Sequence, residues 1–143
     1  MLSNTCKYGI RALSYLASKS EESKNVRIKE ISDDMKLPTP FLAKIFQQFV
    51  KNKILISSKG PHGGYSFIKD PSSVSLYDII EIIDGCNFFE TCIIHNRKCE
   101  SEGNLCPIHE DYEKIRKSII KLFQNTSIYQ LVIAESKSKK IIL

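Results

Sequence analysis

A chain of 143 residues with 42% apolar and 26% charged side chains can form a globular core, and its apolar runs are shorter than the about 18 residues that cross a bilayer. The N-terminus has no basic stretch followed by an apolar one, so we expect no secretion signal and a cytoplasmic protein. The net charge of +5 is uneven: residues 1–70 contain 12 Lys and Arg against 6 Asp and Glu, and residues 71–143 contain 9 against 10. The N-terminal half therefore suits an anionic partner such as DNA, although a solvated basic surface would give the same counts.

Three helices are predicted in the first third of the chain. Apolar residues at helical spacing predict helices over 4–19 and 28–36. After a break at Pro38, Thr39 as N-cap and Pro40 as first helical residue predict a third helix. Its apolar stripe consists of Leu42, Ile45, Phe46, Phe49 and Val50. Two helices joined by a tight turn, the second strongly amphipathic, are typical of a helix-turn-helix.

A β-hairpin is predicted directly after these helices. The β-prone runs 54–58 and 65–68 flank the glycine-rich segment 59–64, which is where a wing follows a helix-turn-helix. A nucleotide-binding P-loop is excluded, because neither Lys-Ser/Thr nor a helix follows these glycines. Ser75 and Asp78 then form a predicted capping box for a helix that ends at Gly85.

The polar face of the third helix and the wing are the expected DNA-binding surface. The candidate residues are Thr39, Ala43, Lys44, Gln47, Gln48, Lys51, Lys59 and His62, with Arg11 and Lys36 as further phosphate contacts. Lys and Gln side chains can bind base edges in the major groove as well as phosphates. A simple solvated face is the alternative, but helix-turn-helix, wing and basic charge together favour nucleic acid.

Four of the five cysteines lie between positions 86 and 106, where no helical or strand periodicity is found. Such clustering in a cytosolic chain indicates metal binding or redox chemistry rather than disulfides. The predicted ligands are Cys92, Cys99, Cys106 and His109. Cys106 precedes Pro107 and is expected at or beside the N-cap of the next helix, whose dipole would lower the pKa of the thiol. His95 is a weaker ligand candidate, Cys86 is expected to be a spare thiol, and Cys6 is expected to pack in the core.

Several kinds of site remain open for these residues. Three cysteines with one histidine are unusual for simple electron transfer, which normally uses four cysteines, and suit an iron–sulfur cluster that responds to conditions. A zinc site is an alternative, although no two cysteines have the separation of two to four residues common in zinc sites. Metal-free thiol sensing is a further alternative. No nucleophile–base pair or cofactor motif is found, so we expect neither an enzyme nor a small-molecule substrate.

A long helix is predicted from Pro107 onward, with an apolar stripe of alternating four- and three-residue spacings. The stripe consists of Ile108, Tyr112, Ile115, Ile119 and Leu122. This 3.5-residue period is typical of two helices packed side by side, and we favour a homodimer interface over an intramolecular contact. A short helix near 127–134 and a Lys-rich tail complete the chain.

Four segments resemble the IscR/NsrR/CymR family of bacterial winged-helix regulators: residues 42–46, the string 60–65, the helix end 79–85 and the cysteine loop. The resemblance implies a dimer crossed through the C-terminal helix, binding an inverted repeat in double-stranded DNA. IscR-like members hold [2Fe–2S] with three cysteines and a histidine three residues after the third; here each arm between cysteines is one residue longer. NsrR-like members hold [4Fe–4S] with three cysteines and a carboxylate from the first helix of the partner subunit, and the matching position in this chain is Lys7, which has no carboxylate. The resemblance therefore favours [2Fe–2S], with [4Fe–4S] possible.

The recognition helix departs from the family pattern at Ala43-Lys44, where relatives often carry Glu-Gln, and this leaves the operator sequence open. Taken together, the sequence predicts a mainly α fold with a small β-hairpin: a winged helix-turn-helix over 1–84, a cysteine-rich loop over 85–107, and a dimerisation helix with tail over 108–143. The predicted function is a transcription regulator that senses iron–sulfur status, nitric oxide or redox state.

Overall fold

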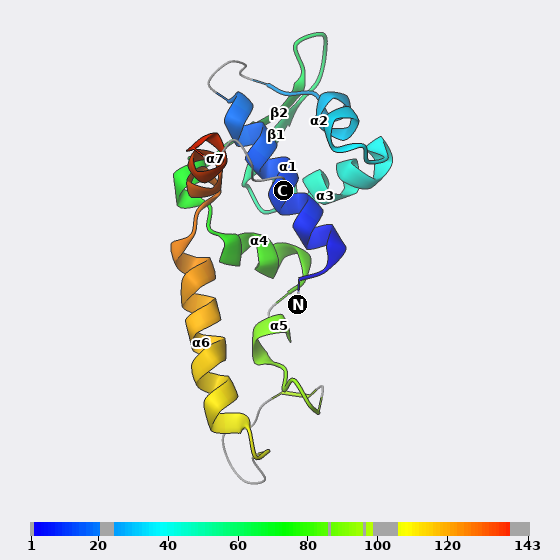
Figure 1. Ribbon diagram of the computed structural model, residues 1–143. Helices are drawn as coiled ribbons and strands as arrows, with labels where there is room; N and C mark the ends of the chain where they lie inside the picture. The colour runs from blue at the N-terminus through cyan, green and yellow to red at the C-terminus, as the bar shows by residue number, and fades with distance from the viewer. Residues whose placement is uncertain (1, 21–24, 86, 96, 99–105, 138–143) are drawn as a thin grey trace.

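The computed structural model describes residues 2–20, 25–85, 87–95, 97–98 and 106–137. It shows a helical domain with a β-hairpin, from which one long helix extends (Figure 1). The elements are α1 (Asn4–Lys19), α2 (Ile28–Met35), α3 (Thr39–Lys51), β1 (Leu55–Ser58), β2 (Gly64–Phe67), η1 (Pro71–Ser73), α4 (Leu76–Ile83), α5 (Asn87–Glu90), α6 (His109–Asn125) and α7 (Ile128–Lys137). The predicted class, mainly α with a small β-hairpin, is confirmed.

The first three helices enclose the main core, as their apolar spacing predicts. The α3 residues Leu42, Ile45, Phe46 and Phe49 are at most 1% exposed. Between α2 and α3, Lys36 adopts a left-handed conformation (φ 54°), and the Leu37 amide donates to the Ser32 carbonyl at 2.9 Å. These contacts make the tight turn of a helix-turn-helix.

The prediction that Thr39 caps α3 is wrong. Pro38 occupies the N-cap position and Thr39 is the first helical residue. The hydroxyls of Thr39 and Ser32 lie 2.8 Å apart and share a hydrogen bond, so the Thr39 side chain joins α3 to α2 instead of binding the helix end. The sequence pattern places a capping residue only to within a position or two, and here the partner on α2 determines where the side chain bonds.

The wing is a two-stranded antiparallel sheet in which Ser57 pairs with Tyr65 and Ser58 with Gly64. Val26, ahead of α2, extends the sheet on the other side of β2: its amide donates to the Tyr65 carbonyl at 3.0 Å, and the Tyr65 amide donates back at 2.8 Å. The Tyr65 ring packs edge-on against Phe46 of α3, with ring centroids 4.9 Å apart. The wing therefore packs directly against the buried face of α3.

Replacing Gly64 by alanine is expected to destabilise the chain by at least about 3 kcal/mol, because two costs add. Its φ of +145° disfavours a side chain, and an added Cβ would lie 2.5 Å from the Val26 carbonyl oxygen, a backbone atom that cannot move aside. Gly60→Ala is the matched control: its φ of +100° carries the conformational cost alone, about 1 kcal/mol, since nothing lies within 4 Å. Urea unfolding of both variants measures the difference, and equal losses would contradict the proposed clash.

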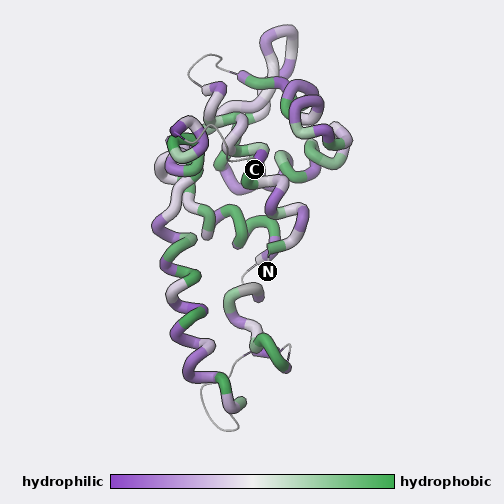
Figure 2. Tube along the Cα trace, viewed as in Figure 1, coloured by the Kyte–Doolittle hydropathy of each residue, from purple (hydrophilic) through white to green (hydrophobic). Residues whose placement is uncertain are grey.

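The helices after the wing form a second layer of the core. Ser75 caps α4 through the predicted capping box with Asp78, and α4 is almost continuously hydrophobic (Figure 2). The start of α4 is bonded to the link between α6 and α7, where the Leu76 amide donates to the Thr126 carbonyl at 2.9 Å. Ile128 of α7 is fully buried, so α7 returns to the core while α6 projects from it.

Residues 87–90 form one helical turn, α5, in a stretch where the sequence indicates no regular structure. Phe89 explains this difference, since it is 6% exposed and stacks on Tyr77 of α4 with ring centroids 4.8 Å apart. It also meets Phe123 of α6 edge-on at 6.3 Å. A four-residue helix is too short for any periodicity, so only these tertiary contacts identify it. Within the described residues, no helix combines the length and apolar character needed to cross a membrane.

Candidate nucleic-acid interface and metal site

The outward face of α3 carries most of the predicted DNA-binding residues. Lys44, Gln47 and Lys51 are exposed, and Thr39 and Ala43 are half-buried at the edge of the face. The helix begins without a preceding side-chain cap. Exposed long polar side chains along an otherwise buried helix can reach base edges and phosphates.

Gln48 lies elsewhere on α3. Its side chain is half-buried and lines a groove of about 920 Å³ together with Cys92, Asp84 and residues of α6. The sequence pattern groups Gln48 with Gln47 because both are polar neighbours. In the structure it lines the same groove as Cys92 instead.

The wing tip is held by two residues that the sequence does not single out. Asn25 donates its side-chain amide to the His62 carbonyl at 3.0 Å, and the Arg27 guanidinium donates to the Pro61 carbonyl. These bonds use backbone carbonyls and leave the side chains of Lys59 and His62 exposed. The tip is thus oriented while its cationic and imidazole groups stay accessible, as a phosphate-binding wing requires.

Cys6 is fully buried on α1, and burial together with the nearby Asp84 carboxylate raises the pKa of its thiol to about 12. A thiol that stays protonated inside the core is a poor metal ligand, because the thiolate is the binding form. The expected packing role of Cys6 therefore agrees with its surroundings.

The segment after α5 and the turn ahead of α6 lie at the opposite end of the molecule from the wing (Figure 1), and they contain two cysteines and a histidine that converge. The ligand atoms of Cys92, His95 and Cys106 all lie within 4.8 Å of one another, and Cys92 Sγ lies 3.5 Å from His95 Nδ1. The segment folds back on itself to bring them together: Thr91 pairs with Lys98, and the Cys92 amide donates to the Arg97 carbonyl at 2.7 Å.

The Cys92 thiol lies in surroundings that favour its thiolate. Its pKa is lowered to about 6, first by the backbone amide of His95, then by the His95 side chain and the Ile94 amide. Cys92 is only 6% exposed, so the amides and the imidazole take the place of water around the sulfur. An ionised thiol beside an imidazole is a donor pair for soft and borderline metal ions.

Of the other two predicted ligands, Cys99 and His109, the structure describes only His109. His109 begins α6 and does not belong to the Cys92–His95–Cys106 group. Cys99 and Cys86 lie outside the described residues. Cys106 is not the N-cap of α6, which is Ile108; its carbonyl accepts from the His109 amide at 2.9 Å in a turn that precedes the helix. His95, the weaker ligand candidate in the sequence, lies beside Cys92 and Cys106 instead, and its spacing of three from Cys92 is the sequence signal for that proximity.

A polar link connects the start of α1 to the end of α4, just ahead of the cysteine-rich segment. The Ser3 amide and hydroxyl both donate to the Asp84 carboxylate, at 2.9 and 2.5 Å. Ser3 also caps α1, accepting from the Cys6 amide at 3.0 Å. Ser3 and Asp84 line the groove that contains Cys92 and Gln48. The groove is therefore bordered by the recognition helix, the end of α4 and the candidate metal site.

The residues of the predicted apolar stripe on α6 lie in two different surroundings. Ile108, Ile115 and Leu122 are 43%, 56% and 61% exposed. Tyr112 and Ile119 are half-buried and line the groove beside Cys92. Figure 2 shows the resulting alternation of hydrophobic and hydrophilic positions along α6. Ile115 and Leu122, spaced seven apart, form an apolar ridge that is more than half exposed in the single chain.

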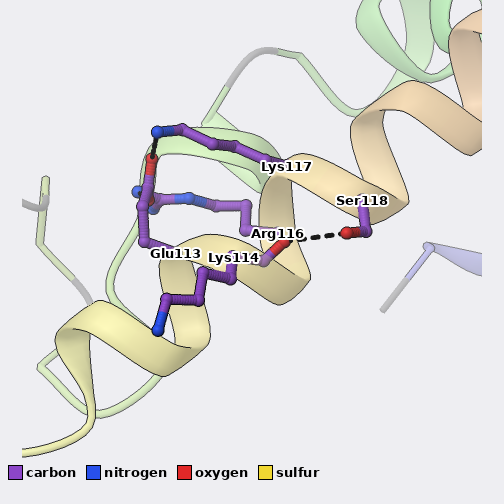
Figure 3. Close-up of polar contacts among 5 residues, drawn as sticks. All are labelled: Glu113, Lys114, Arg116, Lys117 and Ser118. Atoms are coloured by element: carbon purple, nitrogen blue, oxygen red, sulfur yellow. Dashed lines mark hydrogen bonds and ion pairs between the residues drawn. The ribbon is translucent and has the colours of Figure 1, made fainter.

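Charged residues on α6 are paired beside this stripe (Figure 3). Glu113 accepts from Arg116 and lies 3.5 Å from the Lys117 ammonium. Partial burial raises the pKa of Glu113, but hydrogen bonds and charge from Arg116 and Lys117 lower it further, and the net pKa is below its ordinary value. The Arg116 side chain is 12% exposed and lies over the Tyr112 ring, 5.8 Å from its centroid. These contacts fix the groove-facing side of the helix.

A helix-turn-helix followed by an anchored wing, with an exposed polar face on its second helix, defines a winged-helix regulator. The chain belongs to the Rrf2 family, whose model is described as an iron-dependent transcriptional regulator and matches residues 2–134. A protein of Aquifex aeolicus named as an HTH-type transcriptional regulator is 35% identical over 96% of this chain and 94% of its own. IscR of Yersinia pseudotuberculosis is 24% identical over 92% of this chain and 78% of its own. These names indicate a transcription regulator rather than an enzyme.

Solved structures share the fold. CymR, the global cysteine regulator of B. subtilis, superposes with a TM-score of 0.80 at 21% identity, covering 94% of this chain and 97% of its own. IscR of T. potens gives a TM-score of 0.78 at 20% identity, covering 100% and 93%. The predicted family and fold are therefore confirmed.

Proposed function

We propose that this regulator binds an inverted-repeat operator in double-stranded DNA as a homodimer in the cytoplasm, and that an iron–sulfur cluster on its cysteines modulates that binding. Residues 1–84 would read DNA, 85–107 would bind the cluster and 108–143 would dimerise. The observation that carries the DNA-binding part is the exposed face of α3 beside a wing tip fixed through its backbone. The signal would be iron–sulfur status, nitric oxide or redox state.

The DNA contacts divide by chemistry. Lys44 and Gln47, both exposed on α3, are proposed to read base edges, with Thr39 and Ala43 at the edge of the contact. Lys51, Lys59 and His62 are proposed to contact phosphates, which set affinity and register but not sequence. Gln48 is a weaker candidate, because it lines the groove beside Cys92.

Replacing Lys59 by alanine is expected to weaken binding equally for matched and mismatched DNA, and to lower the salt slope by about one unit, as loss of one phosphate contact does. The operator is first obtained by selection from random-sequence duplexes, where we expect two inverted half-sites one helical turn, about 34–36 Å, apart or a multiple of it. Anisotropy titrations at several salt concentrations then measure the slope. Lys121→Ala on α6 is the matched control and should leave the slope unchanged; an unchanged slope for Lys59→Ala removes this residue from the interface.

The donor set fits the proposed cluster. Cys92 and Cys106 already lie together, and thiolates with an imidazole are the ligands that iron–sulfur clusters accept. The cluster would be held by Cys92, Cys99, Cys106 and one histidine. The sequence pattern predicts that this histidine is His109. A bound cluster would supply a site that changes with oxidation, nitric oxide or iron supply. [2Fe–2S] is favoured and [4Fe–4S] is the alternative.

The groove offers a route from the cysteines to the DNA-binding face. Cys92 and Thr91 line it from one side, Gln48 of α3 from another, and Tyr112 and Ile119 of α6 from a third. A change in the position of Thr91 and Cys92 would alter the groove that α3 and α6 also line. Coupling of this kind is typically about 1–3 kcal/mol.

A further inference from the structure

The arrangement of Cys92, His95 and Cys106 also suits a single metal ion when no cluster is bound. Three ligand atoms lie within 4.8 Å of one another. A tetrahedral zinc ion, with bonds of about 2.3 Å to sulfur and about 2.0 Å to nitrogen, holds its ligand atoms roughly 3.5–3.8 Å apart. The three ligand atoms would therefore need to move closer together by roughly 1 Å to bind one ion. In [2Fe–2S], by contrast, each iron takes two protein ligands, so one of the three would have to move to the far iron.

The local chain geometry also matches a single-ion site. Cys92 and His95 are separated by two residues, the short spacing that is absent between any two cysteines here and common in zinc sites. The fold-back of residues 91–98 creates that pair, and the Lys98–Glu90 ion pair at 3.1 Å closes the same segment. Cys106 reaches the pair from the turn ahead of α6. An ion bound here would join the cysteine-rich segment to the start of the long helix.

The ligand types select the metal. Two sulfurs and an imidazole nitrogen disfavour magnesium and calcium, which take oxygen ligands, and suit zinc, which binds sulfur and nitrogen in tetrahedral geometry. We propose that Cys92, His95 and Cys106 bind one Zn²⁺ ion in the cluster-free chain, with His95 rather than His109 as the imidazole ligand. This goes beyond the proposed cluster in two ways. Zn²⁺ would bind Cys92 and Cys106, which are also proposed cluster ligands, and it would bind His95, which is not among the ligands proposed for the cluster.

The test uses the full-length reduced chain, freed of metal and kept under anaerobic conditions without iron or sulfide. Zn²⁺ is titrated against a chromophoric chelator, and Co²⁺ serves as a spectroscopic probe whose visible bands report tetrahedral geometry and thiolate bonding. We expect one equivalent of either ion to bind. His95→Ala should weaken zinc binding at least about tenfold and change the Co²⁺ bands, and His95→Cys should restore tetrahedral binding.

His109→Ala is the matched control and should bind zinc as the wild type does. His95 is exposed, so its replacement is not expected to disturb the core, and circular dichroism checks this. The proposal is overturned if the wild type binds no stoichiometric zinc. It is also overturned if His109→Ala weakens zinc binding while His95→Ala does not. Since iron and sulfide are absent, these outcomes are independent of whether the chain assembles a cluster or binds DNA.

Discussion

Replacing Ile115 and Leu122 together by glutamate is expected to convert the proposed dimer to a monomer and to weaken operator binding at least about 100-fold. These two side chains are 56% and 61% exposed in the single chain and form the apolar ridge of α6. Two charges on that ridge would have to be buried without partners in a helix–helix contact. A monomer engages one half-site at a time and loses the effective concentration that a linked second site supplies.

Both positions are exposed, so the monomer itself is expected to remain folded. Light scattering at micromolar concentration and DNA titration measure the two effects. Lys121→Glu, an exposed change on the same helix, alters the net charge by the same two units but lies off the ridge. It should stay dimeric, and a wild type that is already monomeric at this concentration would contradict the dimer.

Cys92→Ala is expected to abolish iron and sulfide binding and to remove any difference in operator affinity between reconstituted and metal-free protein. For the wild type we expect that difference to be at least about fivefold, the low end of allosteric coupling, and we leave its sign open. Cys92 lies both in the ligand group and in the groove that reaches Gln48 of α3. Loss of this one residue should therefore remove a proposed ligand and also change the groove that α3 lines.

Iron and sulfide analysis after anaerobic reconstitution measures the first effect, and paired titrations on one operator at one salt concentration measure the second. Cys86→Ala is the control, since Cys86 is expected to be a spare thiol, and it should keep most of the iron. Equal affinities of loaded and metal-free wild type would leave a DNA-binding protein that is not a sensor of its cluster.

The helices and the wing were predictable because their signals are local. The apolar stripe from Leu42 to Phe49 repeats with the helical period. The glycine-rich segment between two β-prone runs indicates a hairpin whatever the surrounding tertiary structure. The one helical turn at 87–90 was not predictable, since it forms around Phe89 stacked on Tyr77, two residues twelve apart in the sequence. The winged helix-turn-helix thus follows from periodicity and the order of elements, whereas the family was indicated by the resemblance of particular segments.

The candidate sites depended on the tertiary structure for their details. The sequence indicated that cysteines and a histidine near position 100 bind metal, but two histidines lay at similar distances from them. Only the fold-back of residues 91–98 brings His95 beside Cys92 and leaves His109 on α6. Likewise, Gln47 and Gln48 have the same polarity, so the sequence could not assign them different roles. The structure distinguishes them, because Gln48 lines a groove together with residues of α4 and α6. Spacing along the chain determines which face of an element is apolar, whereas convergence of ligands depends on turns and packing between elements, which local patterns do not encode.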